Sequence, residues 1–503
     1  MGYRILENLR RDFLRYWRGL SLALAASAPA IAAVIEGVAV EARLGRPLAR
    51  TQVVLEGGAG AQRSLTDPLG RFVFKDLPAG VYYLSASRPG FAATRFGQRR
   101  WNGPGTPIVL ERDSRFVAEL RLPKLGAISG EVNDENGVGL PDQQVLVYRR
   151  GPPLELVAHG RTDDRGVYRV AGLEPGFYYV RTAPVQLEDG TDLLPTYFPR
   201  AASPAESVAV EVRLDSETSS VNITPLAGKL FRLTGTVGWP EARSVALYSD
   251  LGRRDASVDA SGGFVFDELP PGHYELLAVS AEGGRHLVAY RTFWLSGDVE
   301  GVHLAPSPAP AVSVLCEDQN GRRLSQGQVM LFLRRKQPPS DREARRLTCQ
   351  GKEPLTPGIW ESAVLTPPEV YVAEIAGEQG RLEQGRFSLA PAQSLVLRVV
   401  LSETPATLRG TVVTREGRPV AGATVLLKPL AADGAWRVYG KSSTRTDVEG
   451  NYRIEGLPPG AYQVLASLEF RTPEEADWET VPSETVTLRE SDRVVLDLKL
   501  SGN

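Results

Sequence analysis

Short stretches in which apolar and polar residues alternate recur along the chain, and each predicts a half-buried β-strand. In TDVEGNYRIEGLPPGAYQVLA (residues 446–466), Tyr452 and Ile454 alternate with polar residues, and Tyr462 and Val464 do so again after LPPG. Proline presets φ in such a turn and glycine tolerates positive φ. The stretch therefore predicts a turn, a strand, a second turn and a second strand.

The same pattern returns at nearly constant spacing. Copies stand at residues 66–86 (TDPLGRFVFKDLPAGVYYLSA), 162–182 and 258–278, and a worn copy stands at 354–374 (PLTPGIWESAVLTPPEVYVAE). The second positions of the five copies are 96, 96, 96 and 92 residues apart, with Leu355 at that position of the worn copy. This period is too long for a solenoid and fits a small sandwich domain.

The predicted fold is all-β, with about five tandem antiparallel β-sandwich domains of roughly seven strands each after an N-terminal signal segment. The predicted divisions are an export signal (1–32) and five sandwiches (33–122, 123–226, 227–306, 307–403 and 404–503), of which the fourth is degenerate. Proline-containing links are short and stiff, so we expect an extended string of domains. No amphipathic helix is expected after residue 33.

The first 32 residues lack the repeat and resemble an export signal. A basic segment precedes an apolar run at 20–26 and a small-residue cleavage site near Ala32. Arg10 and Arg11, followed by Asp12, Phe13 and Leu14, resemble the twin-arginine signal, although Leu9 departs from it and leaves the ordinary secretory route open. The alternative is an uncleaved anchor, but the run is shorter than a spanning helix requires. We expect an exported, periplasmic or extracellular protein with no membrane span in the mature chain.

The repeat also resembles a known family. G-x-V, then G-x-P-[LV]-x-G-[AV]-x-V-x-L, then TDxxGxYxxxxLPPGxY is similar to the carboxypeptidase regulatory-like domain, most completely in the last unit. The resemblance implies a transthyretin-like, carbohydrate-binding-like sandwich that serves as a spacer, stalk or binding accessory in bacterial exported proteins.

Composition and motifs point away from catalysis. The 503 residues carry a formal charge of −2 and no block of like charge, so no nucleic-acid partner is expected. The four histidines lack a Glu three residues later, which a zinc carboxypeptidase would need, and no HExxH, GxSxG, P-loop or GxGxxG is present. We therefore expect no enzyme, catalytic residue, metal or cofactor.

Three sets of residues deserve separate hypotheses. The recurrent acids are expected to hold turns by accepting backbone N–H groups: Asp67, Asp163, Asp259 and Asp447. Calcium binding together with residues 134–137 or 318–321 is the alternative, although neither run has the ligand spacing of a full calcium loop. The two cysteines, Cys316 and Cys349, are candidates for a disulfide in an oxidising compartment, with two buried free thiols as the alternative.

The third set lies in two loop excursions, at residues 91–105 and 193–200. Their aromatic and arginine side chains are the types that anchor interfaces on a rigid sandwich: Phe96, Arg99, Arg100, Trp101, Tyr197 and Phe198. The alternative is that the rings cover the open end of their own sandwich or the joint between the first two.

Together these features predict an exported, non-catalytic scaffold or binding protein, whose partner is a polysaccharide or another cell-envelope protein. The alternative is an accessory subunit of an extracytoplasmic hydrolase related to peptidases or glycosidases, or such a hydrolase with an unrecognised site.

Overall fold

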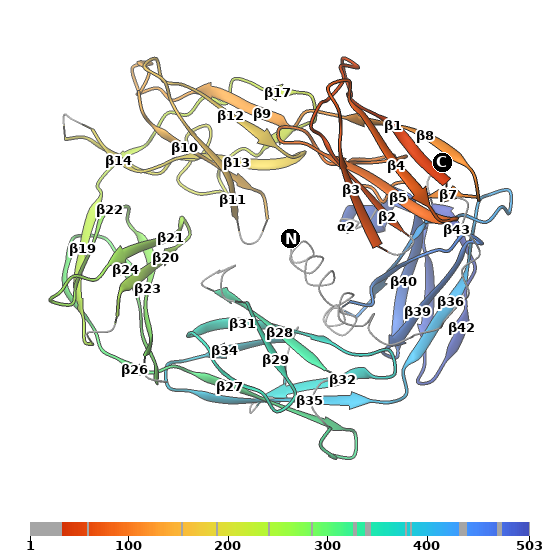
Figure 1. Cartoon of the computed structure of the whole chain (residues 1–503). Helices are drawn as coiled ribbons and strands as arrows, with labels where there is room; N and C mark the ends of the chain where they lie inside the picture. Colours follow the sequence, from red (N-terminus) through yellow and green to blue (C-terminus); the bar gives the residue numbers. More distant parts are fainter. Residues whose placement is uncertain are drawn as a thin grey trace.

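Alternating strands pair into small sheets along nearly the whole chain, as the sequence predicts (Figure 1). The computed structural model describes residues 33–501 apart from 58–59, 152–153, 188–189, 240–241, 283–284, 325–328, 338–343, 378–379, 383–384, 432–439 and 470–474. The predicted export signal, including Arg10 and Arg11, lies outside the described residues.

The strands group into five sandwiches, numbered here in chain order. Sandwich 1 contains β1 (Ala33–Glu41), β2 (Gln52–Gly57), β3 (Gly60–Leu65), β4 (Arg71–Leu77), β5 (Gly80–Ser87), β6 (Thr94–Arg95), β7 (Ile108–Leu110) and β8 (Arg115–Leu122). Sandwich 2 contains β9 (Gly126–Glu131), β10 (Gln144–Arg149), β11 (Glu155–Arg161), β12 (Val167–Leu173), β13 (Gly176–Thr182), β14 (Val185–Gln186), β15 (Asp192–Leu193), β16 (Val210–Val212), β17 (Glu217–Thr218) and β18 (Ala227–Gly228). Sandwich 3 contains β19 (Phe231–Val237), β20 (Ser244–Ser249), β21 (Gly252–Ser257), β22 (Gly263–Leu269), β23 (Gly272–Glu282), β24 (Arg285–Leu295) and β25 (Val299–Leu304).

The remaining strands form the last two sandwiches. Sandwich 4 contains β26 (Ser307–Pro308), which pairs back to β24, then β27 (Ala311–Asp318), β28 (Met330–Gln337), β29 (Ala344–Thr348), β30 (Lys352–Pro354), β31 (Gly358–Leu365), β32 (Tyr371–Gly377), β33 (Gly380–Arg381), β34 (Arg386–Leu389) and β35 (Ser394–Ser402). Sandwich 5 contains β36 (Ala406–Val413), β37 (Thr424–Pro429), β38 (Ser443–Arg445), β39 (Asn451–Leu457), β40 (Gly460–Ser467), α2 (Glu475–Thr480), β41 (Glu484–Leu488), β42 (Arg493–Val495) and β43 (Leu498–Ser501).

One topology repeats in all five. The first strand pairs antiparallel with the strand before the LP-G turn and parallel with the closing strand, as in β4-β1-β8. The second sheet is a run of antiparallel neighbours such as β3-β2-β5, which in sandwich 5 also joins the first sheet through the parallel pair β40–β43. The parallel pair arises because the chain crosses between the two sheets before its last strand returns beside its first.

Each sandwich encloses its own apolar core, so alternation along a strand decides which side chains are buried. In sandwich 1, Val53, Leu55, Phe72 and Phe74 point inward and are almost fully buried. Equivalent clusters fill the other four. The tandem sandwich prediction is confirmed, while the residue boundaries between sandwiches stay a prediction.

In the structure, the fourth copy matches the other four in a different register from the one that its sequence spacing predicts. In the other sandwiches, a tyrosine hydroxyl donates to the carbonyl four residues earlier, at 2.6–2.7 Å: Tyr82, Tyr178, Tyr274 and Tyr462. In sandwich 4, the Trp360 Nε1 donates to the Thr356 carbonyl at 2.9 Å, and β31 occupies the place of β40. Leu355 is thus the counterpart of Leu457, and the prediction that it replaces the turn Asp was wrong.

One short helix, α2, departs from the expectation of none after residue 33. Trp478 on α2 packs against Leu426 and Leu465, on the face of the β37–β40 sheet opposite the core. Among the described residues, no helix is both long enough and apolar enough to cross a bilayer.

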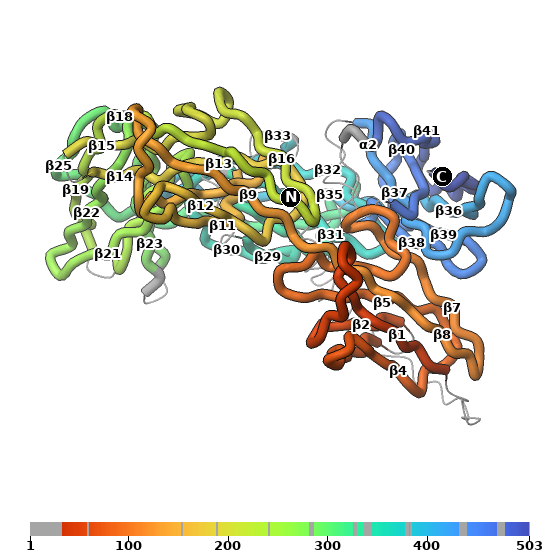
Figure 2. The backbone as a smooth tube through the Cα atoms, turned by 90° about the horizontal axis from the view of Figure 1, so that it is seen from above, coloured from red at the N-terminus to blue at the C-terminus, as the bar shows by residue number. Residues whose placement is uncertain are grey.

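The sandwiches form a ring instead of the expected extended string (Figure 1). Figure 2 shows that sandwich 1 projects to one side of the band formed by the other four. Side-chain contacts at three of the joints hold neighbouring sandwiches together. At the joint of sandwiches 3 and 4, the buried Arg335 guanidinium lies 5.2 Å from the Tyr248 ring centroid and donates to the Pro357 carbonyl.

Lys441 links sandwiches 4 and 5. Its Nζ donates to the Thr366 Oγ1 at 2.7 Å, to the Val370 carbonyl at 3.0 Å and to the Gly456 carbonyl of its own sandwich at 2.8 Å. Burial lowers the pKa of Lys441 from 10.5 to about 8, although nearby Glu369 acts in the opposite direction.

Sandwiches 5 and 1 close the ring. The Arg445 guanidinium lies 4.7 Å from the Tyr83 ring centroid, a cation–π geometry. Gly422 packs so closely against Pro107 that an added Cβ would lie 2.6 Å from the proline ring. These contacts bring together segments more than 300 residues apart, which link stiffness alone cannot predict.

Candidate binding site

The first loop excursion is a tightly hydrogen-bonded segment on the side of sandwich 1. The Thr106 amide donates to the Phe96 carbonyl at 2.7 Å, and the Gly103 amide donates to the Arg100 carbonyl at 3.0 Å. The Arg95 side chain donates from Nη1 to the Gly103 carbonyl at 3.2 Å. These bonds link the residues on either side of the tip, residues 98–102.

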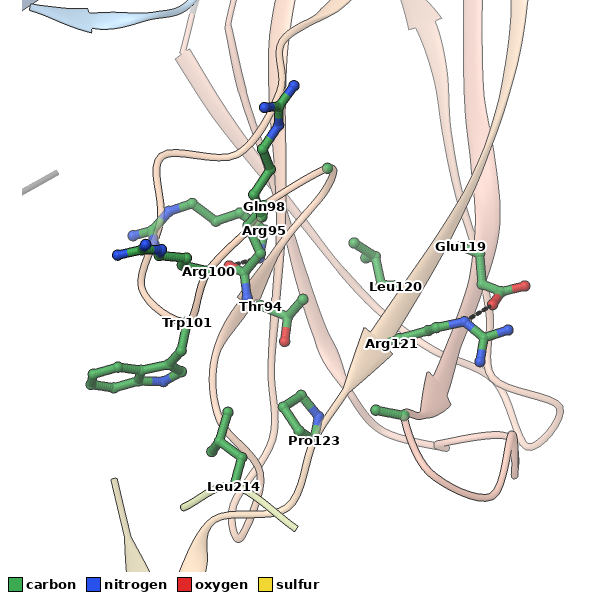
Figure 3. A pocket seen from close by; sticks show the side chains of 13 residues that line it. Thr94, Arg95, Gln98, Arg100, Trp101, Glu119, Leu120, Arg121, Pro123 and Leu214 are labelled. Carbon is green, nitrogen blue, oxygen red and sulfur yellow. Dashed lines mark hydrogen bonds and ion pairs between the residues drawn. The ribbon is translucent and has the colours of Figure 1, made fainter. Parts of the chain in front are cut away.

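The tip borders a hollow of about 340 Å³ at the joint of sandwiches 1 and 2. Figure 3 shows Trp101 at its mouth, with Leu214 of sandwich 2 and Pro123 of the link nearby. Its lining side chains are mostly polar or charged: Thr94, Arg95, Gln98, Arg99, Arg100, Glu119 and Arg121. Of the loop residues singled out by sequence, Arg99, Arg100 and Trp101 thus share one site.

The other three singled-out aromatics lie in packing positions. Phe96 packs against the core of sandwich 1 and meets Phe116 edge-on, with ring centroids 5.3 Å apart. Tyr197 is 1% exposed, and Phe198 packs against the core of sandwich 2. Burial favours the alternative in which these rings cover their own sandwiches.

Tyr197 also covers a buried cation. The Arg181 guanidinium lies 4.8 Å from the Tyr148 ring centroid and 5.6 Å from that of Tyr197, and its Nη2 donates to the Tyr148 hydroxyl at 2.6 Å. Burial raises the pKa of Tyr148, with the positive charge of Arg181 acting in the opposite direction. The second excursion is therefore part of a packed face.

Six lining residues of the hollow lie outside the predicted excursion, and the sequence gave no reason to select them: Ala42, Glu119, Leu120, Arg121, Pro123 and Leu214. Glu119 and Arg121 alternate outward on β8, as in any half-exposed strand, and form an ion pair at 2.6 Å. This strand edge becomes one side of the hollow because Leu214 of sandwich 2 lies near it.

The recurrent acids lie in turns. In each of the four, one carboxylate oxygen accepts the backbone N–H groups two and four residues later, as Asp447 does from Glu449 at 3.1 Å and Asn451 at 2.7 Å. Hydrogen bonds to the charged form lower a carboxyl pKa. The pKa of Asp163 is lowered chiefly by the amide of Val167, and that of Asp259 chiefly by the Ser261 side chain.

Asp134 and Asp318, which begin the runs considered for calcium, accept backbone N–H groups in the same way. Within the described part of the chain, no three His, Cys, Asp or Glu side chains gather as metal ligands would.

A threonine before the turn acid is a feature that sequence reasoning passed over. The buried Thr446 Oγ1 donates to the Val420 carbonyl at 2.6 Å and accepts the Ala423 amide at 2.9 Å. Thr66 and Thr162 make the same pair of bonds in their own sandwiches. The TD dipeptide thus ties the turn to the core as well as shaping it.

In sandwich 4 the place of this threonine is taken by Cys349, which directly follows β29 as Thr446 follows β38. Cys349 is joined to Cys316 of β27 in the structure, and both are fully buried. The disulfide thus ties the position after β29 to the first strand of its sandwich, whereas the threonine clamp ties the equivalent position to the segment before the second strand.

Comparison with known proteins gives one family and several similar folds. Residues 34–111 and 407–501 match the carboxypeptidase regulatory-like domain family. No curated protein matches the chain. Similar solved structures include the minor pilin GBS52 of Streptococcus agalactiae, with 15% identity over 39% of this chain and 96% of that one and a TM-score of 0.25. A streptococcal ancillary pilin has 12% identity over 54% of this chain and 99% of that one, with a TM-score of 0.19. The pilus protein RrgB of Streptococcus pneumoniae has 8% identity over 75% and 98%, with a TM-score of 0.16.

Proposed function

Because sandwiches 1 and 5 are carboxypeptidase regulatory-like domains, we propose that this chain is an exported, non-catalytic scaffold that binds a polysaccharide in the hollow between sandwiches 1 and 2. The observation that carries the proposal is the placement of Trp101. Its ring stands half-exposed at the mouth of a polar hollow, on a loop fixed by its own hydrogen bonds. A flat ring beside hydrogen-bonding side chains suits the apolar face and hydroxyl groups of a sugar.

The partial exposure of Trp101 also favours a ligand over simple packing at this residue. Burial of three other aromatic rings stabilises their sandwiches: Phe96, Tyr197 and Phe198. Trp101 belongs to none of the core clusters and leaves part of its ring in water. A partly exposed indole at the edge of a hollow is the kind of side chain that anchors an interface.

Retention on immobilised polysaccharides tests the proposal. Trp101→Ala should reduce retention by about two- to twelvefold, since a stacked ring contributes ~0.5–1.5 kcal/mol beyond its buried area. Trp294→Ala is the matched control, because Trp294 is 69% exposed on sandwich 3, away from the hollow. Equal retention of the wild type and Trp101→Ala, or equal loss in both variants, would refute binding at this site.

Export is the second part of the proposal and has its own test. The motivation is the basic segment followed by an apolar run and Ala32. N-terminal sequencing of the protein recovered outside the cytoplasm should begin near Ala33. An intact Met1 on that protein would contradict cleavage, and Lys-Lys in place of Arg10 and Arg11 should block export only on the twin-arginine route.

A further inference from the structure

The hollow is strongly basic in a chain that is nearly neutral. Four arginines and one glutamate line it, so positive charge is in excess among the lining side chains, whereas the whole chain has a formal charge of −2. An excess of one sign of charge raises the local concentration of ions of the opposite sign. Arginine also presents paired N–H donors that match the two oxygens of a carboxylate.

One of these arginines has a second role. Arg100 Nε lies 2.9 Å from the Glu469 Oε2 of sandwich 5, and the Glu469 carbonyl packs beside Gly103 in the same loop. The loop that forms one wall of the hollow is therefore also part of the contact that closes the ring. The Glu469 carboxylate pairs with the Arg100 guanidinium, and the carboxylate of an acidic ligand would make the same interaction.

We infer that the hollow selects an acidic saccharide, such as a uronate, whose carboxylate competes with Glu469 for Arg100. The inference rests on the proposed polysaccharide binding at this site. Because binding and ring closure then share one guanidinium, each weakens the other, and linkage requires the two effects to be equal in free energy.

The exposure of Arg100 and Glu469 sets how strongly their ion pair can compete with a bound carboxylate. The Arg100 side chain is 57% exposed and that of Glu469 18% exposed, so their ion pair is a partly screened surface pair. Pairs of this kind contribute little, and we expect removal of the competing charge to raise affinity for the acid by about two- to fivefold. The Arg445–Tyr83 and Pro107–Gly422 contacts remain, so occupancy loosens the ring contact without abolishing it.

The experiment measures binding of tri-galacturonate and of its neutral methyl ester by isothermal titration calorimetry, using the full mature chain. Glu469→Gln should bind the acid about two- to fivefold more tightly than the wild type. Glu484→Gln is the matched control, because it removes the same charge from an exposed position on β41 of the same sandwich. It should leave affinity unchanged.

A second readout follows the ring itself. Fluorescent labels on cysteines introduced at the exposed positions Val109 and Val448 report the separation of sandwiches 1 and 5 by energy transfer. Tri-galacturonate should lower the transfer in the wild type, and Glu469→Gln should lower it without ligand.

The outcomes separate the two proposals. If neither saccharide binds the wild type, both binding at the hollow and this inference fail. If the ester binds as tightly as the acid, or if Glu469→Gln changes neither affinity nor transfer, polysaccharide binding stands and the inference is overturned.

Discussion

Replacing the sandwich 4 disulfide by the residues that its neighbours use measures what the bridge contributes. Cys316 corresponds to Val412 and Cys349 to Thr446, because the Leu324 amide donates to the Cys316 carbonyl as the Val420 amide donates to that of Val412. The double variant Cys316→Val/Cys349→Thr therefore restores the pattern of sandwich 5 in sandwich 4. It removes the cross-link without leaving a free thiol.

The expected loss can be worked from the structure. The bridge joins residues 33 apart, and closing a loop of that length in the unfolded chain corresponds to about 3–4 kcal/mol in the chain-entropy model. The introduced threonine can return about 1 kcal/mol if its hydroxyl makes the clamp bonds seen for Thr446. The net destabilisation of sandwich 4 should be about 2–3 kcal/mol.

Amide hydrogen exchange on the full chain gives a local measurement. A loss of about 2–3 kcal/mol accelerates exchange through sandwich 4 unfolding by roughly 30- to 150-fold, and peptides from β27 and β31 should show it. Peptides from sandwich 1 are the internal control and should not change. Equal exchange in the wild type and the variant would refute the reasoning. So would two reactive thiols in the unfolded, unreduced wild type, because the cysteines would then not be bridged.

Three further outcomes are expected. Lys441 has a folded-state pKa of about 8, below its ordinary 10.5, so its cost to stability is greatest below pH 8 and disappears as pH rises toward 10.5. Denaturant unfolding of wild type and Lys441→Met at pH 7.5 and 9.5 should show the difference moving by about 2 kcal/mol in favour of the wild type at the higher pH, and the exposed control Lys499→Met should show no such movement. Tyr197→Ala should lower the Tm, with a loss of about 3–5 kcal/mol, because it opens a cavity over Arg181; an unchanged melting curve would contradict its packing role. A fragment of residues 405–503 should fold alone, since its core cluster is its own, and a random-coil circular dichroism spectrum would count against that independence.

Local sequence determined the sandwiches. Alternation decides which residues of each strand are buried. The TD dipeptide and the four-residue turns such as LPPG set the turns, because these features act within a few residues. Where these features are weak, the sequence pattern predicts the wrong register. In the fourth copy the spacing places Leu355 at the turn Asp position, whereas the hydrogen bond of Trp360 shows that Leu355 is the counterpart of Leu457.

Tertiary structure decided how the sandwiches sit together and what their outer faces do. The sheet face opposite the core is covered in sandwich 3 by Arg335 of sandwich 4, in sandwich 5 by Trp478 of its own helix, and in sandwich 1 it meets Arg445 of sandwich 5. A half-buried strand has the same pattern whichever partner covers its second face. The hollow beside Trp101 likewise depends on the placement of sandwich 2, because its walls come from segments that pattern alone cannot bring together.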